Sequence, residues 1–184
     1  MSEGAKSFGD YTKVFYKNKL IRPGWRDPAD RITMAPYNFK GKTVLDLGCS
    51  VGGMLFALAD KIRMGWGVDI DPEPIETAKQ IAKEQQIENL KFSTLDLSVA
   101  GNLEELPRTD IVFALSIAKH INNWTEIIKS LKPKRCLFEA NGGRTGEAIP
   151  SQIEWLKKNF KTSEMLLEGY EGTRKLLFAS NFKT

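Results

Sequence analysis

Short apolar runs alternate with amphipathic stretches from residue 41 almost to the C-terminus. Five of the runs have the length of buried strands, at residues 43–47, 66–70, 91–95, 110–115 and 135–140. Between them, apolar side chains recur every three or four positions, which predicts helices at residues 52–62, from Pro72 or Pro74 onward, at 124–131 and at 151–160. Strands that alternate with helices form parallel sheets with helices on both faces. We therefore predict an α/β fold of this kind.

The two ends of the chain depart from this alternation. Residues 163–170 and 173–180 are strand-like runs joined by Glu171-Gly172, which predicts a hairpin in place of another strand–helix unit. Residues 1–40 lack a clean period, and a short helix from Asp30 is the element expected there. No repeat or linker interrupts the rest. We predict one domain at residues 41–184, preceded by an N-terminal extension at residues 1–40.

Composition narrows the class of protein without identifying it. The 184 residues are 41% hydrophobic, which is enough for the core of one domain. Two cysteines and one histidine supply neither a disulfide framework nor a zinc site, so no metal is predicted. No apolar run reaches membrane-spanning length and the N-terminus is polar, so we expect a cytoplasmic protein without a membrane partner. The net charge of +4 is compatible with an anionic partner, although no DNA-binding or other nucleic-acid motif accompanies it.

The most informative stretch is residues 43–53, where an apolar strand runs through Asp46 into a turn rich in glycine. About twenty residues further on, the next strand ends in Asp69 and Asp71. A glycine-rich turn lets the backbone approach a ligand closely, and an acid on the following strand can hold ribose hydroxyls. The combination predicts a pocket for a nucleoside with a charged tail. The alternatives are a tight turn without a ligand and, for Asp46, a loop cap.

A nicotinamide cofactor is the natural competitor for such a pocket. Its fingerprint is Gly-x-Gly-x-x-Gly, with the pyrophosphate at the helix N-terminus. The sequence Gly48-Cys-Ser-Val-Gly-Gly53 does not supply that pattern. Asp46 also suits a cationic part of a ligand better than a pyrophosphate, because opposite charges attract. These observations favour a different nucleoside cofactor.

Two motifs resemble those of the class I S-adenosylmethionine-dependent methyltransferases. Residues 44–53 are similar to the first motif of that family and read Val-Leu-Asp-Leu-Gly-Cys-Ser-Val-Gly-Gly. Residues 67–72 are similar to its second motif and read Gly-Val-Asp-Ile-Asp-Pro. The resemblance extends from Gly41 to the C-terminus. It implies a Rossmann-like sheet of seven strands, mostly parallel with an antiparallel last strand, and S-adenosylmethionine as the cofactor. Ser50 stands where the family often has the middle glycine.

The resemblance also implies which residues contact the cofactor. The set is Asp46, Gly48, Ser50, Gly52, Asp69, Ile70, Asp96, Leu97 and Arg26. Asp46 would take the methionine end through its amino group or a bridging water, and Asp69 would accept both ribose hydroxyls, with Asp71 capping the next helix. Ile70 would pack on one face of the adenine.

Asp96 would accept the adenine amino group, with Leu97 helping to enclose the ring; the alternative for Asp96 is a surface loop acid. Arg26, in the segment before the first strand, would hold the methionine carboxylate bidentately. Its alternative is a solvated surface arginine.

Candidates for the chemistry follow the fourth strand, since ligands of open α/β sheets bind beyond the carboxyl ends of the strands. Ser116 and His120 are the polar groups expected to face the transferred methyl. An unperturbed histidine has a pKa suited to a general base at neutral pH, although His120 could also be a helix cap or a surface side chain. The run from Leu115 to His120 is also faintly similar to RNA 5′-phosphate capping methyltransferases.

We expect an S-adenosylmethionine-dependent methyltransferase that acts on a small molecule. One alternative is an RNA methyltransferase, for which residues 1–40 would form a phosphate-contacting arm instead of a lid. Another is a non-catalytic S-adenosylmethionine-binding subunit, because a fold alone does not establish activity.

Overall fold

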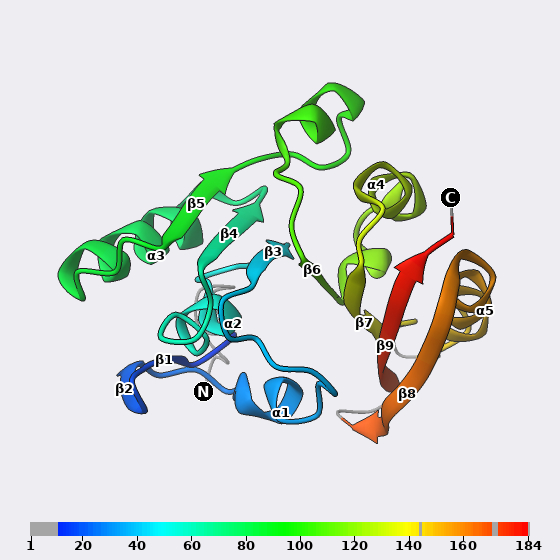
Figure 1. Ribbon diagram of the computed structural model, residues 1–184, viewed down its shortest axis with the longest axis horizontal. Coiled ribbons are helices and arrows are strands. Elements are labelled where there is room, and N and C mark those ends of the chain that lie inside the picture. The colour runs from blue at the N-terminus through cyan, green and yellow to red at the C-terminus, as the bar shows by residue number, and fades with distance from the viewer. Residues whose placement is uncertain (1–10, 144, 171–172, 184) are drawn as a thin grey trace, which may run out of the picture.

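The computed structural model describes residues 11–143, 145–170 and 173–183. Its central feature is a seven-stranded sheet in the order β5-β4-β3-β6-β7-β9-β8 (Figure 1). The strands are β3 (Thr43–Leu47), β4 (Met64–Asp69), β5 (Leu90–Thr94), β6 (Ile111–Leu115), β7 (Arg135–Ala140), β8 (Phe160–Tyr170) and β9 (Arg174–Phe182). The first five pair in parallel, and β9 is antiparallel to both β7 and β8. The predicted fold class is confirmed.

The helices cover both faces of this sheet. They are α1 (Ala29–Ile32), α2 (Gly53–Phe56), α3 (Pro72–Glu84), α4 (Trp124–Leu131) and α5 (Ile149–Asn159), with 3-10 helices at Ala100–Glu105 and Ile117–Lys119. Apolar side chains of α2 and α3 pack on one face, whereas those of α4 and α5 pack on the other. The strand order reverses between β3 and β6, which places a crevice for a ligand at the carboxyl ends of these two strands.

Strand alternation decides which side chains face this crevice from the α2 side of the sheet. Successive residues of a strand point to opposite faces. Val44 on β3 and Leu137 on β7 belong to the core cluster on the α2 face, so Asp46 and Glu139, two residues further along each strand, point to that face as well. Two acids of mostly apolar strands therefore lie on the same side of the sheet, near its carboxyl edge.

Helix α2 is shorter than the predicted 52–62. After Phe56 the chain continues in turns with bonds such as Leu58 N–H to Leu55 C=O and Lys61 N–H to Leu58 C=O, which close over three residues instead of four. Leu55, Leu58 and Ile62 are nevertheless all buried. The apolar spacing thus identified the packed face correctly but overestimated the regular helix.

The N-terminal segment contains a hairpin that periodicity did not reveal. β1 (Val14–Tyr16) pairs with β2 (Lys19–Arg22) through a two-residue turn in which Lys17 and Asn18 both have positive φ. Such short strands carry too few residues to produce a recognisable alternation.

This segment lies close against α2. A Cβ added at Gly53 would lie 2.4 Å from Thr12 Cγ2 and 2.6 Å from the Lys13 carbonyl oxygen, so the absence of a side chain permits the contact. In Figure 1, β1, β2 and α1 lie on the α2 side of the sheet. None of the helices in the described part of the chain is long and apolar enough to cross a membrane.

Candidate functional site

The turn between β3 and α2 adopts left-handed backbone conformations at alternate residues. φ is +71° at Gly48, +50° at Ser50 and +77° at Gly52. A residue with a Cβ pays about 1–2 kcal/mol for this conformation, which explains why glycine is favoured there and marks Ser50 as a locally strained position. Gly52 has a second constraint, because an added Cβ would lie 2.5 Å from the ring of Phe92.

Asp69, at the end of β4, joins this turn to the following loop. One carboxylate oxygen accepts the Ser50 N–H at 2.7 Å and the other accepts the Asp71 N–H at 3.1 Å. A carboxylate offers about four acceptor sites. Two backbone bonds therefore fix the orientation of Asp69 and leave acceptor capacity for the hydroxyls of a ligand. Asp71 itself accepts the Glu73 N–H at 3.1 Å and caps α3, as predicted.

Asp46 is 3% exposed and lies below the turn, on the wall of a pocket. Burial raises the pKa of its carboxyl to about 8, the negative charge of Asp69 adds to the rise, and Arg31 opposes it. The carboxyl is thus largely protonated at neutral pH while no cation is present. A positively charged group placed beside it would favour the ionised form.

Five of the predicted site residues line this one pocket: Arg26, Asp46, Gly48, Ser50 and Ser116. Tyr11, Thr12 and Arg31, from the N-terminal segment, complete it together with Cys49, Met54 and Leu115. The pocket therefore lies between the glycine-rich turn, the end of β6 and the N-terminal segment.

The residues predicted to surround an adenine lie along the ends of β4 and β5. Ile70 is a large apolar side chain that is 64% exposed, so its surface is open to a ligand. Asp96 accepts the Ser98 N–H at 2.8 Å and the Ser98 hydroxyl at 2.7 Å, and these bonds lower its pKa. Leu97 is buried in the core on the α4 side. Its predicted contact with the ring stays a prediction.

Ser116, directly after β6, has φ +63° and a hydroxyl whose bonding capacity is used within the protein. The hydroxyl donates to Glu139 Oε1 and accepts from Asn141 Nδ2 and Arg174 Nη1, both at 3.3 Å. A hydroxyl has one donor and two acceptor positions. These three bonds suit Ser116 for holding the network together better than for reacting with a substrate.

His120 follows the 3-10 helix Ile117–Lys119 and is exposed at the same edge of the sheet. Partial burial lowers the pKa of its imidazole, Lys119 and Arg174 lower it further, and Asp69 opposes them. The imidazole is therefore predominantly neutral at physiological pH, which is the form that can accept a proton.

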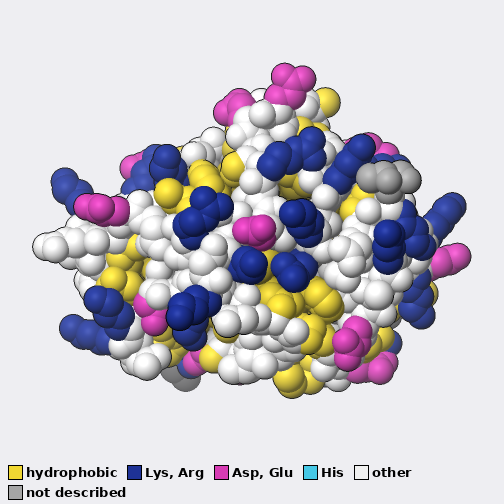
Figure 2. All heavy atoms as spheres, in the orientation of Figure 1, with side chains coloured by type: hydrophobic (Ala, Val, Ile, Leu, Met, Phe, Trp, Pro, Cys, Tyr) yellow, Lys and Arg dark blue, Asp and Glu magenta, His cyan; other side chains and the backbone are white. Residues whose placement is uncertain are grey.

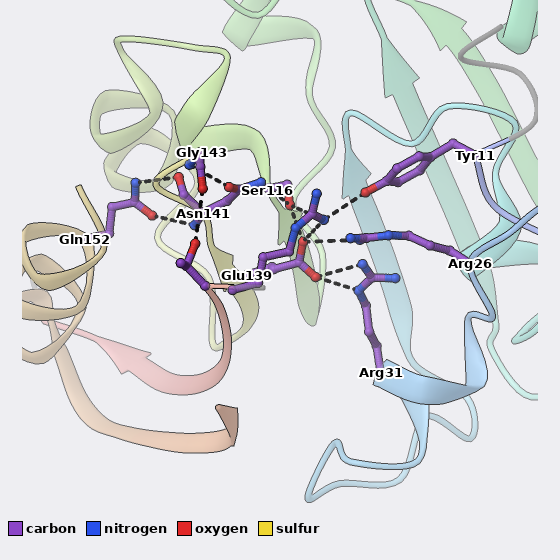
Figure 3. A network of polar contacts seen from close by, with 10 residues as sticks. Tyr11, Arg26, Arg31, Ser116, Glu139, Asn141, Gly143 and Gln152 are labelled. Atoms are coloured by element: carbon purple, nitrogen blue, oxygen red, sulfur yellow. Dashed lines mark hydrogen bonds and ion pairs between the residues drawn. The ribbon is translucent and has the colours of Figure 1, made fainter. Parts of the chain in front are cut away.

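A buried ion cluster around Glu139 was not predicted from the sequence (Figure 3). Glu139 is 0% exposed. Its carboxylate accepts from Arg31 Nε at 2.8 Å, from Arg174 Nη1 at 2.9 Å and from Arg26 Nη1 at 3.4 Å. Arg26, predicted to hold a methionine carboxylate, also places its guanidinium carbon 4.5 Å from the ring centroid of Tyr11. The cluster joins the N-terminal segment to β7 and β9.

Asn141 extends this network toward α5. The Asn141 backbone N–H donates to Gln152 Oε1 at 3.1 Å, and Gln152 Nε2 donates to the Asn141 carbonyl at 3.3 Å. The side-chain oxygen of Asn141 accepts the Gly143 N–H at 3.0 Å. Figure 3 shows the continuous path from Gln152 through Asn141 and Ser116 to Glu139 and the arginines. The signal available in the sequence was a lone acid in the apolar strand 135–140, but its partners come from distant segments.

The fold and the site define a Rossmann-like nucleoside-binding domain with acids around a glycine-rich turn. A family model described as a methyltransferase domain matches residues 38–165, and the chain belongs to this family.

Curated relatives include the ubiquinone biosynthesis O-methyltransferases of Coxiella burnetii and Haemophilus ducreyi. The first is 31% identical over 113 residues, covering 59% of this chain and 47% of the relative, and the second is 32% identical over 114 residues, covering 59% and 48%. The 7SK snRNA methylphosphate capping enzyme of Mus musculus is 38% identical over 89 residues, or 46% of this chain and 12% of the relative. The chain spans about half the length of the first two relatives.

Two solved structures share the fold. The N-terminal domain of EvdMO1, in the presence of SAH and D-fucose, has a TM-score of 0.71 at 16% identity and covers 96% of this chain and 93% of that one. The bifunctional kinase-methyltransferase WbdD has a TM-score of 0.75 at 18% identity and covers 94% and 44%.

Proposed function

We propose that the chain is an S-adenosylmethionine-dependent methyltransferase whose acceptor is a small molecule. The observation that carries the proposal is the arrangement of Asp46, Ser50 and Asp69 around a turn that allows close backbone approach. Two carboxylates at such a turn complement a cationic nucleoside and repel a pyrophosphate. The crystallisation of the EvdMO1 domain in the presence of SAH, the demethylated form of this cofactor, supports the same ligand.

Different residues of the chain would contact different parts of the cofactor. Asp46 would pair with the ammonium of the methionine end, and Arg26, on the wall of the same pocket, would take its carboxylate. Asp69, already oriented by two backbone bonds, would accept the ribose hydroxyls. Exposed Ile70 would cover the adenine, and Asp96 beside Leu97 would accept its amino group.

On the acceptor side, His120 is the proposed general base. The bound cofactor supplies an electrophilic methyl group, so the protein needs only to position the acceptor and remove its proton. A neutral imidazole at the carboxyl edge of β6 can do the second task. Ser116 is proposed as a positioning residue, because its three internal bonds hold the end of β6 against Glu139 and Asn141.

A small acceptor is favoured over RNA by the distribution of charge and by the relatives. Figure 2 shows Lys and Arg side chains interspersed with acidic and neutral surface over the visible face, without a continuous basic track. The ubiquinone biosynthesis O-methyltransferases support a small acceptor. The similarity to the 7SK snRNA methylphosphate capping enzyme keeps RNA as the second candidate. Binding to RNA would weaken steeply as salt rises, whereas binding of an uncharged metabolite would not.

The test is incubation of the pure protein with S-adenosylmethionine labelled in its methyl group and with fractionated cell extract. We expect label in a low-molecular-mass fraction, at least a hundredfold less of it with His120→Ala, given the typical contribution of a general base, and a smaller loss with Ser116→Ala. Asp60→Asn, an exposed acid in the loop before β4, is the matched control.

The other outcomes separate the alternatives. Label in RNA would support the second candidate. Tight binding of the cofactor without any labelled product in any fraction would support a non-catalytic subunit. Full activity of both His120→Ala and Ser116→Ala would overturn their proposed roles while leaving the class of enzyme intact.

A further inference from the structure

Charge is divided between the two halves of the carboxyl edge of the sheet. Asp46 lies near the end of β3, Asp69 ends β4 and Asp96 follows β5, and these strands lie on one side of the switch point between β3 and β6. Lys119 and Arg174 belong to the other side, where the 3-10 helix follows β6 and where β9 begins. The strand ends on the β3 side therefore carry acids, whereas the basic side chains named on the β6 side reach the surface and its acid, Glu139, is buried.

Lys119 is the exposed one of these two basic side chains. Among the residues that the structure describes, no acidic side chain forms an ion pair with it. Its Cε is 4.0 Å from the position of a Cβ built on Gly143, the nearest approach to that position by a described residue that is not adjacent to Gly143 in the chain. Gly143 has φ +72°, and its carbonyl accepts the Thr173 hydroxyl at 3.1 Å. The end of the Lys119 side chain thus lies close to Gly143, whose carbonyl is held by Thr173.

The positive field of the β6 side reaches His120. Lys119 and Arg174 both act on the imidazole, and Asp69 is the opposing charge. Glu139, the acid of the β6 side, is fully buried beneath the arginines, and the side chain of Arg174 is 19% exposed. Of the two cations, Lys119 is therefore the one more open to an anion from solvent, and it directly precedes His120 in the chain.

We propose that the methyl acceptor is a small molecule carrying an oxyanion, a carboxylate or a phosphate, which anchors on Lys119 beside Gly143 with its nucleophilic atom in front of His120. The proposal rests on the proposed function and names the chemistry of its acceptor. A lysine is a mobile point charge that binds either oxyanion without imposing a bidentate geometry. Anchoring one end of the molecule there holds its reacting atom near the base, which is the positioning that methyl transfer requires.

His120 is the only histidine of the chain, so its imidazole C2–H signal in a proton NMR spectrum needs no assignment. Protein saturated with SAH is titrated with inorganic phosphate and, separately, with acetate at constant ionic strength. A bound anion raises the pKa of a neighbouring imidazole. We expect a saturable rise in the pKa of His120 with either anion, and binding weaker by about tenfold in Lys119→Gln, the loss expected for one charge-assisted contact.

Lys61→Gln is the matched control, since Lys61 is exposed in the loop before β4, at the opposite edge of the sheet, and should leave the titration unchanged. An imidazole pKa that does not change with either anion, or anion binding by Lys119→Gln as tight as by the parent protein, would overturn the proposal. Tighter binding of a 5′-phosphorylated oligonucleotide than of phosphate, lost at higher salt, would overturn the small-molecule part. Binding of SAH in the same sample separates these failures from failure of the proposed function.

Discussion

The buried carboxyl of Asp46 predicts that cofactor binding depends on pH. Burial is the main cause that raises its pKa from 3.8 to about 8. Pairing with the ammonium of the cofactor requires the ionised form, so binding at pH 7 must release the proton that the raised pKa keeps on Asp46. Asp46→Asn keeps the shape of the side chain but has neither the charge nor the proton.

The magnitude follows from the difference between the pKa and the pH. Each pH unit below the pKa adds about 1.4 kcal/mol for ionising the carboxyl. Because the bound state holds fewer protons, lowering the pH opposes binding. The affinity for SAH should fall about fivefold from pH 8 to pH 7 and about ninefold from pH 7 to pH 6 in the parent protein, and much less in Asp46→Asn.

The assay is isothermal titration calorimetry with SAH at pH 6, 7 and 8, in pairs of buffers with different ionisation enthalpies. The α-amino group of the ligand also titrates, but it does so equally in solutions of both proteins. The difference in proton release between parent and variant therefore isolates Asp46 and should approach one proton at pH 7. An equal pH dependence of both proteins would refute the reasoning.

Four further outcomes concern the free energy of unfolding in urea. Gly52→Ala should lower it by about 2–4 kcal/mol, from the left-handed backbone and the clash with Phe92. Glu139→Gln should lower it by about 3–5 kcal/mol, because three guanidinium groups lose a buried carboxylate. Asp71→Ala should lower it by about 1 kcal/mol through loss of the cap on α3. The raised pKa of Asp46 means that the free energy of unfolding decreases as pH rises from 4 through 8, and Asp46→Asn should remove that decrease.

Each of these outcomes has a contrary result. Changes below about 0.5 kcal/mol, the range of ordinary surface substitutions, would contradict the first three. The role of the ion pair at Glu139 is tested further by combining Glu139→Gln with Arg31→Gln. The double variant should lose less free energy of unfolding than the sum of the two single variants, because the two side chains interact directly. Parallel stability curves for the parent and Asp46→Asn between pH 4 and 9 would contradict the fourth.

Much of the fold could be predicted because its signals are local. The apolar strand at 135–140 was predicted with its observed bounds, and the last two strand-like runs pair as a hairpin, although their turn at Glu171-Gly172 lies outside the described residues. The hairpin of β1 and β2 was missed because three- and four-residue strands leave no measurable period. The predicted length of α2 was wrong, because apolar spacing does not distinguish a helix from successive turns.

One part of the candidate site could likewise be predicted from local signals, and another part could not. The glycine-rich turn follows β3, and Asp69 ends β4, the next strand along the chain. Their proximity could therefore be predicted from the alternation of strands and helices. The cluster around Glu139 depends on Arg26, Arg31 and Arg174, which are separated from it by 113, 108 and 35 positions. Their convergence depends on how the N-terminal segment and β9 pack, and no local pattern encodes that packing. The division of the chain at residue 40 stays a prediction.

The central claim is that carboxylates at the ends of β3 and β4 bind a nucleoside related to S-adenosylmethionine. Calorimetric titration with SAH tests it most directly. We predict one saturable site in the parent protein, binding at least tenfold weaker in Asp69→Asn, and parent-like binding in Asp60→Asn, with circular dichroism showing all three folded. Absence of heat at millimolar SAH with folded parent protein, or equal affinity in Asp69→Asn, would contradict the account.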